Sequence, residues 1–342
     1  MSSSPHVVAL GGGGGATQVL RAAQAFTDQL TAVIAVTDTG RSTGLARSIG
    51  GIPAPGDLRA TIAAFASDQL MADLLQYRFS GAGVPQLEGM AFGNLLLAAL
   101  SNVTHDFAQA VERAAQMAGC AAQVLPVSTA DTHLCAELAD GTIVEGEVNV
   151  RGLNKSPIQR VFLRDDAPAY LPVLEAIRAA DLVVLGPGSL FTTILAGLLL
   201  SGVADALRET RGQVVYVCNT TTQPGQTDGY RTIDHVRRIV ELVGPGVVDV
   251  AVINRSQPDP AALRQYEAEG LFLLQPDDDE INAIAALGVR PLVRDLTEGV
   301  GQKRAIWNKQ DTVRHSPDAL REVLREVLNH EGTKSTKENY EL

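Results

Sequence analysis

A run of five consecutive glycines lies where a phosphate group could approach the backbone. The run consists of Gly11, Gly12, Gly13, Gly14 and Gly15. Glycines let backbone N–H groups come close to a pyrophosphate, and the start of a following helix adds partial positive charge. With Ala16 the run fits the dinucleotide-binding pattern G-x-G-x-x-[GA], but a glycine run satisfies such a spacing by default. The strand expected before it and the helix expected after it therefore carry the prediction of phosphate or nucleotide binding.

A loop rich in glycine and hydroxyl groups follows the next expected strand, at 31–36. Asp38 stands at the end of that strand, where the dinucleotide-binding pattern calls for an acidic residue. Gly40 and Ser42 belong to the same loop, whose N–H and O–H groups could donate several hydrogen bonds to an anion. The loop extends the predicted nucleotide site.

Three charged residues further on are further candidates for this site. Arg47 and Arg59 are fixed cations suited to bidentate contact with phosphate. Asp57 lies in P-G-D-L-R, just before a helical pattern. An N-cap role and a ligand contact are both open for Asp57, and the two roles are compatible.

Two later loops lie after expected strands in the same way. Gly188 and Ser189, in G-P-G-S-L, could offer a second anion site, or Ser189 could simply cap the helix that follows. Asn219 stands at the end of another strand, where ligands bind open α/β sheets. His235, inside the next expected helix, is interpreted as a packed or surface residue rather than a catalyst.

These loops need a scaffold that brings strand ends together, and the hydrophobic pattern provides one. Short apolar runs at 6–10, 31–36, 182–185, 214–218 and 248–253 alternate with helical patterns. Such alternation predicts an α/β fold with a mostly parallel sheet that helices cover on both faces.

One segment departs from this alternation. Between about 119 and 163, alternating apolar residues surround the turn signal Asp140-Gly141, which predicts a small β subregion inserted into the body. No linker marks a boundary, so we expect one domain over 1–328. A closing helix is expected after Ser316 and Pro317, followed by a flexible polar tail at 329–342.

The composition restricts the classes of partner. The 342 residues are 45% hydrophobic, with a formal net charge of −11 and no block of Lys and Arg, so binding to nucleic acid or to an anionic membrane surface is not expected. The three cysteines form no C-x-x-C pair, no two histidines have metal-ligand spacing, and no signal peptide is recognised. We therefore expect reduced thiols, no metal site and a cytoplasmic location.

Taken in order, these stretches resemble the family of the bacterial gluconeogenesis factors and the 2-phospho-L-lactate transferases, and look closest to the former. The matching stretches are the glycine run through Arg21, D-T-G-R-S-T-G from Asp38, A-P-G-D-L-R, G-N-L-L-L-A-A-L from Gly93, G-P-G-S-L-F-T-T-I-L, Y-V-C-N-T-T-T-Q-P-G-Q-T, R-Q-Y-E-A-E-G and R-H-S-P-D-A-L. The resemblance covers about residues 6–328.

The resemblance implies a Rossmann-like body whose loops bind a nucleotide-containing ligand. In the gluconeogenesis-factor branch this is a UDP-sugar such as UDP-N-acetylglucosamine, with links to carbon metabolism and to cell shape or wall synthesis. In addition to the glycine run, Asp38, Gly40 and Ser42, the resemblance places ligand contacts at Thr17, Asn94, Gly188, Ser189, Asn219, Tyr266 and Arg314.

This sequence departs from the family pattern at three positions. Thr39 replaces the second acidic residue of a D-D pair, which removes carboxylate charge that could hold Mg²⁺. Arg41 replaces a glycine, and Met90 stands where a histidine is frequent. These changes argue against metal-assisted transfer and leave ligand binding intact.

The leading hypothesis is therefore a UDP-sugar-binding regulatory protein that requires no cofactor, with a homodimer and a regulatory protein partner expected. The rival is a phospholactyl transferase that uses Mg²⁺, with Asp38 and Asp57 as its catalytic carboxylates. A third reading is an NAD-binding Rossmann protein. The sequence does not identify the base or sugar of the ligand. It also predicts that Gly13→Val abolishes ligand binding and changes stability by only about 1–2 kcal/mol.

Overall fold

The computed structural model describes residues 4–81, 83–257, 260–297 and 315–330. Its centre is a seven-stranded sheet in the order β10-β9-β8-β7-β1-β2-β3, and every pairing within it is parallel. The strands are β1 Val7–Gly11, β2 Leu30–Ile34, β3 Gln123–Pro126, β7 Leu182–Leu185, β8 Gln213–Val217, β9 Val250–Asn254 and β10 Arg290–Arg294.

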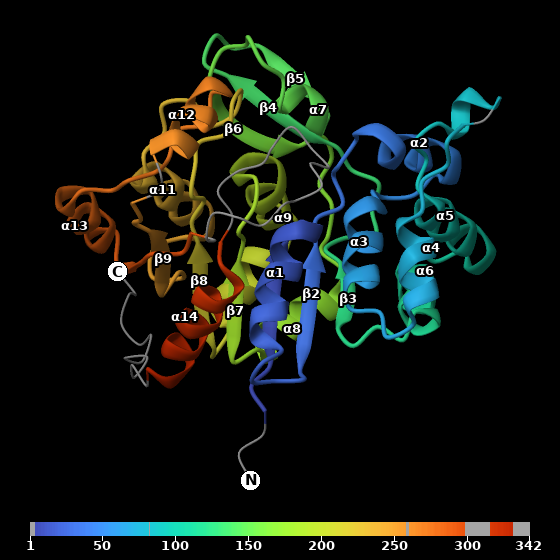
Figure 1. The fold of residues 1–342 in the computed structure, drawn as a ribbon, viewed down its shortest axis with the longest axis horizontal. Coiled ribbons are helices and arrows are strands. Elements are labelled where there is room, and N and C mark those ends of the chain that lie inside the picture. Colours follow the sequence, from blue (N-terminus) through green and yellow to red (C-terminus); the bar gives the residue numbers. More distant parts are fainter. Residues whose placement is uncertain (1–3, 82, 258–259, 298–314, 331–342) are drawn as a thin grey trace.

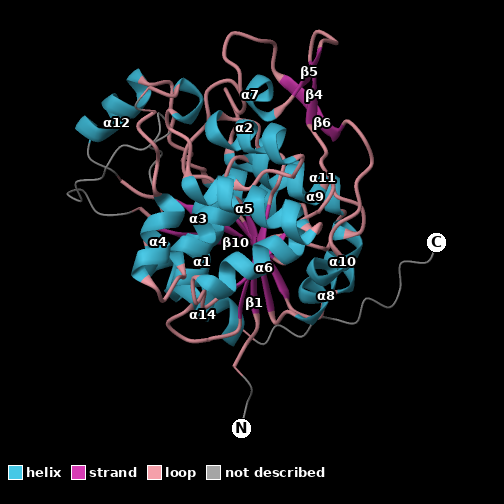
Figure 2. Ribbon diagram, turned by 90° about the vertical axis from the view of Figure 1, so that its right-hand side faces the viewer, coloured by secondary structure: helices cyan, strands magenta, loops and turns pink. Residues whose placement is uncertain are grey.

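Helices cover both faces of this sheet. Figure 2 shows the sheet nearly edge-on, with α1, α3, α4 and α14 on one side and α8, α10 and α11 on the other. The helices before the small sheet are α1 Gly13–Ala23, α2 Arg41–Gly50, α3 Gly56–Ala64, α4 Gln69–Gln76, the 3₁₀ turn Pro85–Leu87, α5 Phe92–Thr104 and α6 Phe107–Met117. Those after it are α8 Leu171–Ala179, a π-helical stretch Leu190–Leu195, α9 Ala196–Leu198, α10 Val203–Glu209, α11 Thr232–Val243, α12 Pro260–Ala268, α13 Asp278–Ala286 and α14 Pro317–Asn329.

The predicted α/β class and mostly parallel sheet are confirmed. Strands β1, β2, β7 and β9 are buried at every position, as continuous apolar runs covered on both faces should be. The pairing register aligns β1 with its two neighbours: Ala9 lies opposite Ala32 of β2 on one side and Val184 of β7 on the other. The carboxyl ends of β1, β2 and β7 therefore finish at one level of the sheet.

The chain order creates a switch point beside β1. From β1 the chain proceeds outward through β2 to β3; it then returns to β7 on the opposite side and proceeds outward to β10. The loops that leave β1 and β7 consequently diverge to different faces, which opens a crevice above their carboxyl ends.

The predicted β subregion is confirmed as a separate three-stranded antiparallel sheet in the order β5-β4-β6. It consists of β4 Leu134–Leu138, β5 Ile143–Glu145 and β6 Ile158–Leu163, with the short helix α7 Glu147–Val150. The turn at Asp140-Gly141 connects β4 to β5, with Asp140 Oδ1 accepting a hydrogen bond from Thr142 N at 2.9 Å. Figure 1 shows this sheet above the carboxyl ends of the main strands.

Two edge strands of the main sheet differ from the prediction. Gln123–Pro126 falls within the predicted β subregion but pairs with β2 as one edge of the main sheet. Arg290–Arg294, at the other edge, carries two arginines and a proline and so gives no continuous apolar signal.

The predicted closing helix is confirmed as α14. The Ser316 side chain accepts a hydrogen bond from Ala319 N, and the helix buries Leu320, Val323, Leu324 and Val327. Just before it, His315 is buried with Nε2 3.0 Å from the Cys218 carbonyl oxygen, and burial lowers the pKa of His315 to about 4. The tail is expected at 329–342, but α14 includes Asn329; residues 331–342 lie outside the described residues.

Two expectations from the composition concern the state of the cysteines and the association with membranes. Cys120, Cys135 and Cys218 are all free, as predicted. No helix in the described part of the chain is long and apolar enough to cross a membrane.

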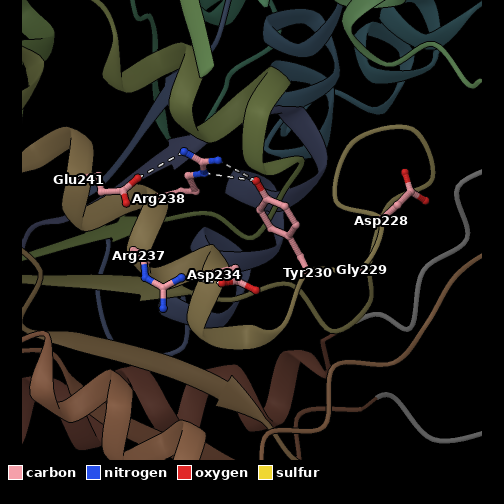
Figure 3. A pocket seen from close by; sticks show the side chains of 7 residues that line it. All are labelled: Asp228, Gly229, Tyr230, Asp234, Arg237, Arg238 and Glu241. Atoms are coloured by element: carbon pink, nitrogen blue, oxygen red, sulfur yellow. Dashed lines mark hydrogen bonds and ion pairs between the residues drawn. The ribbon is translucent and has the colours of Figure 1, made fainter. Parts of the chain in front are cut away.

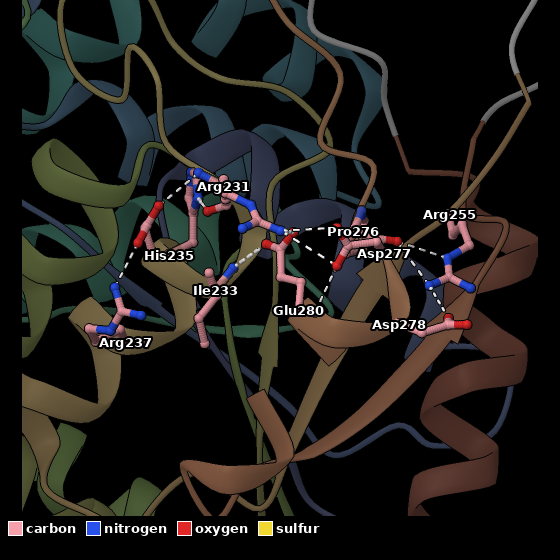
Figure 4. A network of polar contacts seen from close by, with 10 residues as sticks. Arg231, Ile233, His235, Arg237, Arg255, Pro276, Asp277, Asp278 and Glu280 are labelled. Atoms are coloured by element: carbon pink, nitrogen blue, oxygen red, sulfur yellow. Dashed lines mark hydrogen bonds and ion pairs between the residues drawn. The ribbon is translucent and has the colours of Figure 1, made fainter. Parts of the chain in front are cut away.

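A polar network fixes the start of α11 against α13 (Figure 4). Glu280 is buried, accepts a hydrogen bond from Ile233 N at 2.7 Å, and forms an ion pair with Arg231 at 2.9 Å. On the same helix, Asp278 is 89% exposed and pairs with Arg255 at 3.0 Å. Helix α13 thus carries one buried carboxylate, Glu280, and one exposed carboxylate, Asp278, and each pairs with an arginine.

Glu280→Ala should lower the free energy of unfolding by about 1–3 kcal/mol, since it leaves the buried Ile233 N–H without its acceptor, whereas Arg231 keeps its ion pair with Asp277. Asp278→Ala is the matched control and should cost less than about 1 kcal/mol. Urea denaturation of both variants measures this, and equal losses would contradict a buried stabilising role for Glu280.

Candidate functional site

A cavity of about 350 Å³ lies at the switch point, above the carboxyl ends of β1, β2 and β7. The loops after β1, β2, β7 and β8, the start of α3 and the short helix α7 enclose it. Its lining residues are Gly12, Gly13, Gly14, Gly15, Ala35, Thr37, Asp38, Asp57, Glu147, Arg151, Pro187, Gly188, Ser189, Thr192, Thr193 and Gln223. Four of the five predicted glycines therefore lie in one hollow with Asp38, Asp57, Gly188 and Ser189.

The glycine run forms the end of β1 and the first turn of α1. The first amides of a helix have no acceptor within the helix, so those of Gly14 and Gly15 are available to a ligand in the cavity. Gly11 is the last residue of β1, and its carbonyl accepts a hydrogen bond from Ala35 N at 3.0 Å. The arrangement is a strand, a glycine turn and a helix N-terminus.

The space around each glycine of this turn shows whether the fold requires a glycine there. A Cβ at Gly15 would lie 1.7 Å from the Pro187 carbonyl oxygen, so only glycine allows the β1 and β7 loops to meet. A Cβ at Gly12 would lie 2.7 Å from Asp57 Oδ2. At Gly14 a Cβ would meet nothing within 4 Å, so the fold itself does not need a glycine there.

Gly13 corrects one expectation. A Cβ at Gly13 would lie 2.8 Å from the Asp57 carbonyl oxygen, which is backbone and cannot rotate away. This contact argues against the expectation that Gly13→Val changes stability by only about 1–2 kcal/mol, because the new side chain would push α1 away from α3.

Asp57 does not cap the helix that contains it. Helix α3 begins at Gly56 after Pro55, without a side-chain cap, and Asp57 stands in its first turn. The Asp57 carboxylate instead accepts a hydrogen bond from Gly13 N–H at the start of α1. Burial raises the pKa of Asp57, the Gly13 N–H opposes this shift, and the nearby Asp38 adds to it.

Asp38, in the loop after β2, and Glu147, in α7, interact with each other in the cavity lining. Asp38 Oδ1 accepts a hydrogen bond from Gly40 N at 2.8 Å, which fixes the loop after β2. Glu147 is buried and forms an ion pair with Arg151 at 2.7 Å. Burial raises the pKa of Glu147; Arg151 opposes the shift and Asp38 contributes to it.

The loop after β7 forms the opposite wall. Ser189 Oγ donates to Gln226 Oε1 at 2.8 Å and accepts from Thr192 Oγ1 at 2.8 Å. Ser189 precedes the π-helical stretch and makes no side-chain cap to it. The Ser189 hydroxyl is thus engaged within the protein, and both Gly188 and Ser189 line the cavity.

Several buried polar atoms around these strand ends have no hydrogen-bond partner in the described part of the chain. They are Thr17 Oγ1, Thr37 Oγ1, Asn219 Oδ1, Thr221 Oγ1 and Gln223 Oε1. Thr37 and Gln223 line the cavity itself. Buried polar groups are nearly always paired, so these atoms indicate a place where a polar ligand completes the bonding.

Three of the predicted contacts, Ser42, Asn94 and Arg59, are connected by hydrogen bonds. Asn94 Nδ2 donates to Ser42 Oγ at 3.1 Å, and Arg59 Nε donates to Asn94 Oδ1 at 3.1 Å. Arg59 also bonds Gln76, and burial and Arg78 lower the pKa of Arg59 to about 10. Arg47, likewise buried, pairs with Asp131.

The other predicted contacts lie elsewhere. Gly40 lies beside Asp38, Thr17 lies on α1 and Asn219 lies just after β8, but none of them lines the cavity. Tyr266 lies half-buried on α12. Arg314 lies outside the described residues. His235 is buried, with Nδ1 3.1 Å from the Arg231 carbonyl oxygen, as expected of a packed histidine.

Sequence reasoning missed Glu147 and Arg151. Both come from the small sheet, which only the tertiary fold brings over the strand ends (Figure 1). Their i, i+4 spacing is common to many surface ion pairs and carries no functional signal.

No group of three or more His, Cys, Asp or Glu side chains among the described residues could hold a metal. Thr39 occupies the second acidic position of the family pattern, and its Oγ1 accepts a hydrogen bond from Val148 N at 3.4 Å. Asp38 is therefore the carboxylate that this loop contributes to the cavity.

A second hollow, of about 420 Å³, lies beside α11 (Figure 3). Its charged side chains are bonded to one another: Arg238 donates to the Tyr230 hydroxyl at 3.2 Å, and Arg237 pairs with Asp234 at 2.7 Å. Its lining residues come from α11 and the loop before it, and none of them lines the switch-point cavity.

The fold and the cavity define an α/β protein of the Rossmann-like type, with a glycine turn at its switch point. A family model described as 2-phospho-L-lactate transferase CofD matches residues 7–297. The chain is 34% identical over 330 residues to the gluconeogenesis factor of Bacillus subtilis, covering 96% of this chain and 99% of that protein. It is 35% identical over 334 residues to the putative gluconeogenesis factor of Aquifex aeolicus, covering 95% and 97%.

A solved structure agrees. The chain matches a crystal structure of a UPF0052 family member from Bacillus halodurans with a TM-score of 0.85 and 33% identity, over 95% of this chain and 99% of that one. The chain belongs to the gluconeogenesis factor family and carries its CofD-like domain.

The two cavity glycines that differ most in their surroundings give a stability test. Gly15→Ala should lower the free energy of unfolding by about 3 kcal/mol or more, since its Cβ would overlap the Pro187 carbonyl. Gly14→Ala should be neutral or stabilising by up to about 1 kcal/mol, since alanine favours the helix and nothing obstructs it. Urea denaturation compares them; equal effects would contradict the assigned contact.

Proposed function

We propose that this chain is a cytoplasmic regulatory protein that binds a nucleotide sugar, of the UDP-sugar class, in the cavity at the switch point. The observation that carries the proposal is that helix-start amides and carboxylates line one and the same cavity. A nucleotide sugar needs both, because it joins a diphosphate to hydroxyl-rich rings.

The diphosphate is assigned to the amides of Gly14 and Gly15 and to the backbone of Gly188 and Ser189. A helix N-terminus attracts negative charge, and the open space at Gly14 leaves room for a phosphate oxygen. Asp57 covers the Gly12 and Gly13 side of the same turn, so the anion is directed to Gly14 and Gly15.

The hydroxyl-bearing part is assigned to the carboxylate side of the cavity. Ionised carboxylates only accept hydrogen bonds. A sugar hydroxyl can donate one to them and is itself uncharged. Asp38 occupies the position at which the dinucleotide pattern places a ribose contact. Ser42, Asn94 and Arg59 are proposed to support this wall from behind, and Asn219, Thr17, Tyr266 and Arg314 to extend the ligand contacts.

A regulatory role fits this site better than catalysis. A transferase that acts through Asp38 and Asp57 with Mg²⁺ is the alternative that the family model's name favours. In this chain Thr39 stands at the second acidic position of the loop after β2, which leaves less carboxylate charge to hold Mg²⁺. We propose that the ligand acts by changing contacts with a protein partner or a second copy, with effects on carbon metabolism and cell shape or wall synthesis.

Calorimetry with UDP-N-acetylglucosamine, UMP, GDP and NAD, each with and without Mg²⁺, tests this function. The expected result is binding of the UDP-sugar with the same affinity whether or not Mg²⁺ is present. Binding of GDP only with Mg²⁺, without heat from any uridine ligand, would favour the transferase and contradict the proposal. Preferred binding of NAD would favour the dinucleotide alternative.

Gly14→Leu places the predicted phosphate position under direct test. The side chain would occupy the cavity beside the helix-start amides, so UDP-sugar affinity should fall at least tenfold, about 1.4 kcal/mol. Gln116→Leu, on the exposed surface of α6, adds the same side chain away from the site and should bind normally. Thermal unfolding of both should resemble the wild type, and unchanged affinity in Gly14→Leu would exclude the phosphate from this turn.

A further inference from the structure

The small antiparallel sheet contributes two charged side chains to the cavity through one short helix. Helix α7 follows Gly146, whose φ of 87° turns the chain away from β5. Its backbone is fixed to the sheet, since Gly146 N donates to the Leu134 carbonyl and Asn149 Nδ2 to the Glu145 carbonyl. Glu147 and Arg151 are therefore placed over the cavity by a rigid element rather than by a free loop.

The two oxygens of Glu147 have different surroundings. Oε1 accepts from Arg151 Nη1 at 2.7 Å. Oε2 lies 3.9 Å from the place that a Cβ on Gly40 would occupy, and Asp38 Oδ1 lies 3.3 Å from that same place. Two carboxylates thus converge on the Gly40 backbone, and only one of the four oxygens is used by a cation.

Asp38 and Glu147 are close enough to interact directly. Burial raises the pKa of Glu147, and the charge of Asp38 and a hydrogen bond between the two carboxyl groups add to this shift. Without a ligand the pair can share one proton, since like charges this close destabilise each other in a partly buried site. Neighbouring hydroxyl groups of a ligand would instead donate one hydrogen bond to each ionised carboxylate without adding charge.

An independent feature points to a ligand at this place. Thr37 precedes Asp38 and is 1% exposed, and its Oγ1 has no hydrogen-bond partner in the described part of the chain. Thr37 also lines the cavity. A polyhydroxylated ring, which both donates and accepts, would complete Thr37 and the two carboxylates together.

We propose that Glu147 is a specificity-determining residue that accepts a hydrogen bond from a hydroxyl group of the bound nucleotide sugar, and that Arg151 is its positioning residue. This inference rests on the proposed function and assigns the hydroxyl recognition to the small sheet. The hydroxyl belongs either to the hexose or to the 2′ position of the ribose, since both present the same chemistry. In either case Glu147 distinguishes ligands that carry the hydroxyl from those that lack it.

The test measures whether the benefit of the hydroxyl depends on Glu147. The affinities of UDP-N-acetylglucosamine, UDP and 2′-deoxy-UDP are measured by calorimetry for the wild type and for Glu147→Gln, which keeps the side-chain volume. Glu145→Gln is the matched control: Glu145 is exposed on the same hairpin and pairs with Arg164. Thermal unfolding of each variant checks that the small sheet remains folded.

The expected result is a loss of about tenfold in affinity for the ligand that carries the recognised hydroxyl, and a much smaller loss for the ligand that lacks it. A selective loss for UDP-N-acetylglucosamine over UDP assigns the hydroxyl to the hexose. A selective loss for UDP over 2′-deoxy-UDP assigns it to the ribose. Glu145→Gln should bind all three ligands as the wild type does.

The positioning role of Arg151 is tested separately, by the ligand affinities of two Arg151 variants. Arg151→Gln should show the same selective loss, and Arg151→Lys should partly restore it, because a lysine still holds the Glu147 carboxylate in place.

Two outcomes would overturn the inference, and they are distinguishable. If the wild type binds the UDP-sugar and Glu147→Gln loses the same factor for every ligand, or none, Glu147 does not recognise a hydroxyl and the proposed function stands. If the wild type binds no uridine nucleotide at all, the proposed function fails, and the inference fails with it.

Discussion

The close approach of the first turn of α1 to the loop after β7 is the contact on which the rest of the site depends. The two loops leave neighbouring parallel strands and meet where a Cβ at Gly15 would lie 1.7 Å from the Pro187 carbonyl. Parallel pairing fixes the strand ends at one level, and the switch in chain direction separates the loops above them. The cavity exists because this contact closes its floor while the open space at Gly14 leaves it accessible.

The cavity combines opposite kinds of polar group. The α1 turn and the loop after β7 present backbone amides, whereas Asp38, Asp57 and Glu147 present carboxylates, with Arg151 as the cation among the described lining residues. A uniformly cationic pocket would suit any phosphate. The mixture at this site suits a ligand with an anionic part and a hydroxyl-rich part, and the small sheet supplies part of the second.

Much of the scaffold could be predicted from the sequence, because its signals are local. Buried parallel strands need continuous apolar runs, and the turn at Asp140-Gly141 marks the small sheet without reference to the rest of the fold. The edge strand Arg290–Arg294 gave no such signal. The site was predictable only where a loop directly follows a strand, as at Gly14 and Asp38. Glu147 and Arg151 reach it through tertiary packing, and the same packing directs Arg59 toward Asn94 and Gln76.

A crystal structure of the chain with bound UDP-N-acetylglucosamine would test most directly where the ligand lies. We expect the diphosphate oxygens within hydrogen-bond distance of the Gly14 and Gly15 amides, and a ligand hydroxyl within hydrogen-bond distance of Glu147. A nucleotide bound elsewhere, for example in the hollow beside Tyr230 and Arg238, would contradict it. So would a diphosphate in the switch-point cavity that lies away from the α1 turn.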